Sequence, residues 1–212
     1  IVQDTAWDGY EEIPAWIMQG YGTMAMEAGE QLKAQGCERP THIFVQAGVG
    51  SLAGAVVGYF ANLYADNPPT FVVEAEAAAC LYKGAAAGDG DIRIVDGDMQ
   101  TIMAGLACGE PNTISWDILK NHVKVFIAAP DWVAANGMRM LAAPIKGDAS
   151  ITSGESGAAP FGALAAMTTL DEYEQLKKDI GLDENSRVLL FSTEGDTDPD
   201  RYKNIVWKGL DK

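Results

Sequence analysis

The stretch T-H-I-F-V-Q-A-G-V-G-S-L-A-G, residues 41–54, decides the fold class of this chain. Residues 41–46 form a short β-rich run that predicts a strand. The small and apolar residues 52–64 predict a helix that is buried on most of its faces. A glycine-rich turn joins these two elements. A strand that passes through such a turn into a helix is typical of open sheets with parallel strands.

Strands and helices alternate along the rest of the chain. Strands are predicted at residues 70–74, 123–128 and 187–192, and helices at 13–36, 75–87, 131–142, 157–170 and 171–180. The apolar run 188–191 has the composition expected of a strand that is buried on both faces. We therefore predict an α/β fold, with an open, mainly parallel twisted sheet and helices on both faces.

The glycine turn has the features of an anion-binding site. Glycines permit close approach of the backbone, and the first turn of the following helix leaves N–H groups unpaired at the positive end of its dipole. These properties suit a phosphate group. The candidate ligands are Gly48, Val49, Gly50, Ser51 and Leu52.

Three interpretations of this turn remain open on the residues alone. Gly48, Gly50 and Gly54 form G-x-G-x-x-x-G, close to the dinucleotide pattern, and Glu74 ends the next strand, where a ribose-binding acid would lie. The second interpretation is a tight turn whose small residues pack a helix on a strand. The third is a site for another phosphate-bearing ligand.

Composition restricts the partners and the compartment. The chain has 212 residues, 48% of them hydrophobic and 21% charged, and its net charge is −15. This charge repels phosphate backbones and anionic lipid, so we expect neither nucleic acid nor a membrane as partner. The three cysteines form neither a disulfide framework nor a metal-ligand pattern, which favours a cytoplasmic protein. Because the chain starts on a strand-like Ile-Val-Gln without methionine, we expect a protein truncated at its N-terminus.

Further polar turns lie where an open α/β sheet binds its ligands. Residues 192–198, S-T-E-G-D-T-D, follow the last predicted strand, and Thr197 or Asp198 before Pro199 also predicts a helix start. Residues 152–158 form a second polar turn that leads into a small-residue helix. Residues 101–111, T-I-M-A-G-L-A-C-G-E-P, form another, and none of them has a metal or catalytic-triad pattern.

These turns, in this order, resemble the fold-type II pyridoxal-phosphate enzymes, the tryptophan synthase β and serine/threonine dehydratase group. Within that group the chain is most similar to the diaminopropionate ammonia-lyases. The blocks that carry the resemblance are IVQDTAWDGY at 1–10, QAGVGSLAG at 46–54, DMQTIMAGLACGEPN at 98–112, ITSGESGA at 151–158 and STEGDTD at 192–198. The resemblance runs from the first residues to Trp207, effectively the whole chain, and it assigns residues 1–212 mostly to the large cofactor-binding domain.

The resemblance implies an activity and roles for particular residues. The implied reaction is the α,β-elimination of 2,3-diaminopropionate, a small amino acid, to pyruvate and ammonia with pyridoxal 5′-phosphate as cofactor. Residues 48–52 match the phosphate-binding loop, and Ser192 matches the hydroxyl that faces the pyridine nitrogen, with Thr193 as its neighbouring rival. Asp4 matches an aspartate that acts as a base toward one enantiomer; without the resemblance, a helix-capping or backbone-bonding role would be expected for it.

The resemblance also implies missing parts and partners. The family's cofactor-bearing lysine lies in an N-x-F-K segment, and neither that segment nor the D-G-N-H-G loop occurs here. We therefore expect an N-terminal portion of the same polypeptide to complete the site, an inactive chain without it, and a homodimer. Cys80 and Cys108 fall at family cysteine positions near the site entrance, where two buried free thiols are favoured over a pair.

Alternative functions are a serine/threonine dehydratase-like lyase, a non-catalytic phosphate-binding module and, more distantly, a nicotinamide oxidoreductase.

Overall fold

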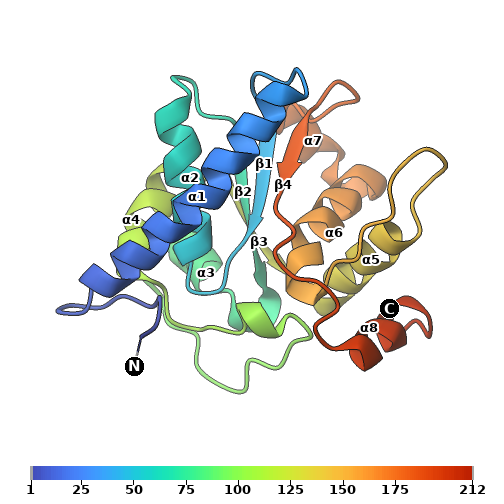
Figure 1. Cartoon of the computed structure of the whole chain (residues 1–212). Helices are drawn as coiled ribbons and strands as arrows, with labels where there is room; N and C mark the ends of the chain where they lie inside the picture. Colours follow the sequence, from blue (N-terminus) through green and yellow to red (C-terminus); the bar gives the residue numbers. More distant parts are fainter. Residues whose placement is uncertain (1, 212) are drawn as a thin grey trace.

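A four-stranded parallel sheet forms the centre of the computed structural model, which describes residues 2–211 (Figure 1). The strand order is β3-β2-β1-β4, and every neighbouring pair is parallel. The strands are β1 (His42–Gln46), β2 (Thr70–Ala75), β3 (Val125–Ala129) and β4 (Val188–Leu190). The predicted fold class is confirmed.

Helices cover both faces of the sheet. One face carries α1 (Glu12–Ala34), α2 (Ser51–Leu63), α3 (Cys80–Ala87) and α4 (Thr113–His122), and the other carries α5 (Asp131–Ala142), α6 (Glu155–Thr169), α7 (Glu174–Ile180) and α8 (Pro199–Val206). Short 3₁₀ turns lie at Glu76–Ala78, Ala104–Leu106 and Asp171–Tyr173. Figure 1 shows α1 and α6 on opposite sides of the strands.

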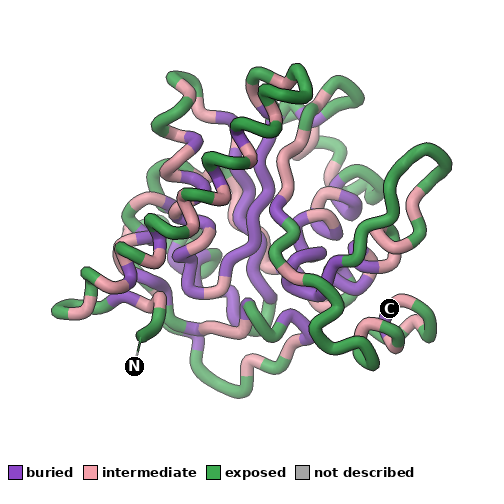
Figure 2. The backbone as a smooth tube through the Cα atoms, viewed as in Figure 1, coloured by how far each residue is buried: buried purple, intermediate pink, exposed green. Residues whose placement is uncertain are grey.

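The strands are apolar on both faces because each face packs against a separate layer of helices. Phe44 and Phe71 point to the α5–α6 side and stack with ring centroids 4.3 Å apart. Ile43, Val45 and Val72 point to the α2 side. All five side chains are fully buried, and the buried tube in Figure 2 follows the strands. Alternation along each strand therefore divides the core into two halves.

The structure corrects several element boundaries. The predicted helix 75–87 is a 3₁₀ turn followed by α3, and helix α4 at Thr113–His122 was missed. The last strand, predicted at 187–192, covers only Val188–Leu190. It pairs with β1 only along His42–Phe44. Further along the chain, the Glu194 carbonyl accepts a hydrogen bond from the Gly154 N–H at the start of α6, at 2.9 Å. Val2 and Gln3 do not form the expected strand.

None of the helices within residues 2–211 has the length and apolar character needed to cross a membrane.

Candidate active site

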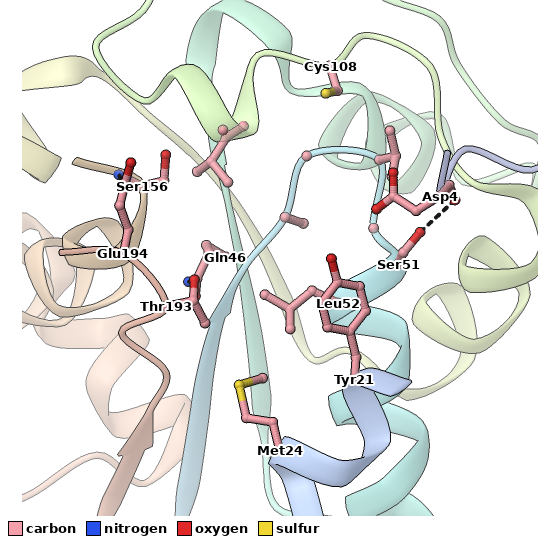
Figure 3. A pocket seen from close by; sticks show the side chains of 16 residues that line it. Asp4, Tyr21, Met24, Gln46, Ser51, Leu52, Cys108, Ser156, Thr193 and Glu194 are labelled. Atoms are coloured by element: carbon pink, nitrogen blue, oxygen red, sulfur yellow. Dashed lines mark hydrogen bonds between the residues drawn. The ribbon is translucent and has the colours of Figure 1, made fainter. Parts of the chain in front are cut away.

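A cavity of about 550 Å³ lies at the carboxyl ends of the strands, where open α/β sheets bind their ligands (Figure 3). Its walls come from the start of the chain, α1, the β1–α2 loop, the 105–108 segment, α6 and the segment after β4. The lining residues are Asp4, Tyr21, Met24, Gln46, Ala47, Gly48, Val49, Gly50, Ser51, Leu52, Gly105, Leu106, Cys108, Ser156, Thr193 and Glu194.

The glycine loop at the start of α2 is built to hold an anion. Gly50 has φ +101°, and a Cβ there would lie 2.8 Å from the Ser115 hydroxyl oxygen. A Cβ on Gly48 would lie 3.2 Å from the Gly105 carbonyl oxygen. Within residues 2–211, the N–H groups of residues 50–52 have no protein acceptor. These residues line the cavity at the positive end of the α2 dipole, so a phosphate fits there.

The two residues that favoured a dinucleotide have other tasks. A Cβ on Gly54 would lie 2.7 Å from the Ser115 Cβ, so this glycine permits close packing of α2 on α4. The Glu74 carboxylate is buried and accepts hydrogen bonds from the N–H groups of Leu81 at 2.8 Å and Tyr82 at 2.7 Å. Burial raises the pKa of Glu74 to about 8. Because Glu74 holds the start of α3, the dinucleotide interpretation is wrong.

Asp4 forms one side of the cavity. Its backbone carbonyl accepts hydrogen bonds from the Ser51 hydroxyl at 2.8 Å and the Asn112 side-chain amide at 2.6 Å. Figure 3 shows Asp4, Ser51 and Tyr21 on the same side of the cavity. Burial and then the Asp4 charge raise the pKa of the Tyr21 hydroxyl, and the same two causes raise the pKa of the Cys108 thiol. The Asp4 carboxylate therefore acts electrostatically on both groups. It does not cap α1, whose N-cap residue is Glu11.

The segment after β4 forms the opposite side. The Gln46 side-chain amide donates to the Thr193 hydroxyl oxygen at 2.9 Å, and both residues line the cavity. The Glu194 carboxylate accepts from the Ser156 N–H at 2.8 Å at the start of α6. Ser192 points elsewhere: its hydroxyl bonds to the Ser153 hydroxyl at 2.8 Å, and it lines a separate groove between α1 and β4.

The structure thus brings together most of the residues that the sequence singled out. Asp4, residues 48–52 and Thr193 line the same cavity, whereas Ser192 does not. Sequence reasoning missed Tyr21, Gln46, Ser156 and Glu194 as lining residues. Gln46 and Ser156 had one usable signal, because each is adjacent to a glycine turn at an element boundary.

The two cysteines near the cavity are both free thiols. The Cys80 thiol is buried and donates to the Cys108 carbonyl at 3.5 Å, so the two residues do lie close together. None of the described residues that line the cavity is a lysine. The arrangement can hold an anionic group at the α2 end and hydrogen-bond a ring atom at the Thr193 end, with one carboxylate at its side.

Comparisons with known proteins place this geometry in a family context. The family model described as "Pyridoxal-phosphate dependent enzyme" matches residues 6–193. The diaminopropionate ammonia-lyase of Salmonella typhimurium is 54% identical over 211 residues, and that of Escherichia coli K12 is 50% identical over 210. Each match covers 99% of this chain and 52% of the relative, so the chain spans about half the length of these relatives.

Solved structures agree with this match. The Escherichia coli diaminopropionate ammonia-lyase in complex with an aminoacrylate–PLP azomethine reaction intermediate superposes with a TM-score of 0.91 at 47% identity, covering 99% of this chain and 53% of that chain. Maize serine racemase superposes with a TM-score of 0.69 at 21% identity, covering 91% of this chain and 54% of that one. The second match shows a shared fold alone.

Proposed function

The chain belongs to the pyridoxal-phosphate dependent enzymes, and we propose that the full-length protein is a diaminopropionate ammonia-lyase. The observation that carries the proposal is the 54% identity across 99% of this chain to an enzyme of that activity. The proposed reaction consumes one water and converts 2,3-diaminopropionate to pyruvate and two molecules of ammonia. The cavity suits it, because an anion-binding end, a hydroxyl and a carboxylate converge there.

The glycine loop would hold the phosphate of the cofactor. Residues 50–52 line the cavity, and within residues 2–211 their N–H groups have no protein acceptor. A Cβ on Gly48 would approach the Gly105 carbonyl oxygen and the Cys108 side chain, which line the same cavity. At the other end the Thr193 hydroxyl would hydrogen-bond the pyridine nitrogen. Its oxygen already accepts the Gln46 amide proton, so its own proton is free to be donated. When bound, pyridoxal phosphate supplies an electron sink for the charge that develops at the substrate Cα.

Asp4 would act as the base for one substrate enantiomer. Its carboxylate lines the cavity, and two hydrogen bonds to its backbone carbonyl hold it there. A carboxylate held within reach of Cα can accept the Cα proton. The substrate β-amino group would then leave as the first ammonia. Hydrolysis by one water would release the α-amino group as the second ammonia, together with pyruvate.

The first experiment measures pyruvate release by the full-length protein supplied with pyridoxal phosphate. 2,3-Diaminopropionate, serine and threonine are compared at equal concentration. Release from 2,3-diaminopropionate well above the other two supports the proposal. Faster release from serine or threonine instead identifies a dehydratase, and no release from any of them contradicts both.

A second experiment tests Asp4 alone. Asp4→Asn is expected to slow turnover of one enantiomer by ~10²–10⁴-fold, the usual effect of one acid–base group. The other enantiomer is the internal control. Equal losses for both enantiomers would remove Asp4 from this role.

The remaining expectations concern partners. We propose that residues 1–212 form mostly the large cofactor-binding domain, that the cofactor-bearing lysine lies elsewhere in the polypeptide, and that the enzyme is a homodimer. The free thiols of Cys37, Cys80 and Cys108 support a reducing compartment, as expected of a cytoplasmic enzyme.

A further inference from the structure

Asn112 joins three parts of the cavity wall. Its side chain is fully buried at the start of α4, where its amide oxygen accepts from the N–H groups of Ile114 at 2.9 Å and Ser115 at 3.0 Å. Its amide nitrogen donates to the Asp4 carbonyl at 2.6 Å and to the Ser51 hydroxyl at 2.8 Å. Its side-chain amide therefore links the start of α4, the first residue of α2 and the backbone of Asp4.

A second bond connects Asp4 to the glycine loop. The Ser51 hydroxyl donates its single proton to the Asp4 carbonyl at 2.8 Å (Figure 3). This proton is therefore not available to a phosphate, and Ser51 can serve an anion through its backbone N–H instead. The Asn112 backbone N–H adds a bond to the Val49 carbonyl at 2.8 Å. The loop and Asp4 thus share one buried network.

Capping α4 does not by itself require an asparagine at position 112. An N-cap needs a side-chain oxygen, and aspartate or serine supplies one as well as asparagine does. The two short hydrogen bonds from the nitrogen go to Asp4 and Ser51, and the Met18 sulfur lies at a longer 3.8 Å. Because buried polar groups are costly when unpaired, displacing either partner disturbs the other.

We propose that Asn112 is a positioning residue that couples the phosphate-binding loop to Asp4. This inference rests on the proposed function, in which Asp4 accepts the Cα proton of one substrate enantiomer. An anion that orders the N–H groups at the start of α2 also orders Ser51, and through Ser51 and Asn112 it holds the Asp4 backbone. The network then fixes the position and the orientation of the Asp4 carboxylate relative to the substrate.

The test uses Asn112→Asp in the full-length protein. Aspartate keeps the capping oxygen for α4 but places an oxygen where the amide nitrogen faced the Asp4 carbonyl and Ser51. Turnover of the enantiomer that depends on Asp4 is expected to fall by ~10²-fold, the scale of a misplaced reacting group. Turnover of the other enantiomer is expected to fall much less, because it depends on the loop that carries Ser51 but not on the Asp4 carboxylate.

A second measurement does not depend on activity. In the cofactor-free protein, hydrogen exchange of residues 2–8 is expected to be about tenfold faster in Asn112→Asp, because a buried hydrogen bond of about 1.4 kcal/mol is lost. Asn121→Asp is the matched control, because Asn121 lies in α4 but far from the cavity wall. Its side-chain amide is exposed and donates to the Asp117 carbonyl at 2.7 Å. Asn112→Ser also caps α4 but is too short to reach both partners, and it replaces Asn112→Asp should that variant not fold.

The outcomes separate this inference from the proposed function. If Asp4→Asn discriminates between enantiomers but Asn112→Asp lowers both equally and leaves exchange of residues 2–8 unchanged, the coupling by Asn112 is wrong. If Asp4→Asn does not discriminate, the role of Asp4 as base fails. Faster exchange in Asn112→Asp would still support the structural link between Asn112 and Asp4.

Discussion

At the scale of single residues, two adjacent hydroxyls after β4 have different surroundings. Successive side chains of an extended segment point to opposite sides. Thr193 consequently lines the cavity and accepts from Gln46, whereas Ser192 bonds to Ser153 outside it. The family pattern pointed to Ser192 first, but the side chain in the cavity wall belongs to Thr193.

Thr193→Val tests this difference. Valine keeps the shape of threonine but removes the hydroxyl, so affinity for pyridoxal phosphate should fall by about fivefold, as for the loss of one neutral hydrogen bond of about 1 kcal/mol. Fluorescence titration of the full-length protein with the cofactor measures this effect. Ser192→Ala is the control and should leave the affinity nearly unchanged. A larger loss of affinity in Ser192→Ala than in Thr193→Val would instead assign the hydrogen bond to the pyridine nitrogen to Ser192.

At the scale of elements, α2 shows why its glycines are not equivalent. A Cβ on Gly54 would lie 2.7 Å from the Ser115 Cβ and 3.1 Å from the Met18 Cε, because α2 packs closely on its neighbours there. A Cβ on Gly58, one turn later, would lie 3.7 Å from Ile118, an ordinary contact. Replacing glycine by alanine at these two positions of one helix is therefore expected to change the stability in opposite directions.

Gly54→Ala should lower the free energy of unfolding by about 1–3 kcal/mol through overpacking. Gly58→Ala should raise it by up to about 1 kcal/mol, because alanine is favoured over glycine inside a helix. Thermal unfolding of both variants beside the parent protein measures the two shifts. A higher melting temperature for Gly54→Ala would contradict the packing of α2 on α4.

Helix α3 starts on a buried carboxylate, which makes its stability depend on pH. Burial raises the pKa of Glu74 to about 8, above the value near 4.5 expected in the unfolded chain. Between these values the folded protein binds more protons than the unfolded one, so the contribution of Glu74 to stability is fully present below about pH 4.5 and falls as pH rises toward 8. The slope contributed by this group is at most about 1.4 kcal/mol per pH unit.

Glu74→Gln should remove this contribution, because glutamine does not titrate and still offers one oxygen to the Leu81 or Tyr82 N–H. Urea unfolding of parent and variant at several pH values between 5 and 8 measures the difference. As pH rises, the free energy of unfolding of the variant should increase relative to that of the parent. Parallel pH profiles would show that Glu74 does not titrate in this range.

At the scale of the whole molecule, the cavity is lined by residues between Asp4 and Glu194, but no lysine of residues 2–211 lines it. The chain also spans 52% of the length of its curated relatives. We therefore expect that borohydride fixes no pyridoxal phosphate to one specific lysine when residues 1–212 are treated alone. Peptide mass spectrometry measures this, with the full-length protein as positive control. Specific labelling of one lysine in residues 1–212 would contradict the proposal that this lysine lies elsewhere.

Local patterns in the sequence determined the strands, most helices and the glycine turn before α2. A strand, a glycine that needs a positive φ and a helix start all depend on neighbouring residues, so they can be read along the chain. The start of α4 also has a local cause, because Asn112 is its N-cap residue and the capping bonds reach only two and three residues along the chain.

Only the tertiary structure decided which side chains meet in the cavity. The Gln46–Thr193 bond joins residues 147 positions apart, and the Asn112–Asp4 bond joins residues 108 positions apart. Glu74 likewise matched a ribose-binding acid by its position, yet its carboxylate is buried against the start of α3. Such contacts depend on how helices pack on both faces of the sheet and on which side each residue points. The spacing of residues along one sequence gives neither the packing of the helices nor the direction of each side chain. It therefore indicated the glycine turn but not the side chains that surround the cavity.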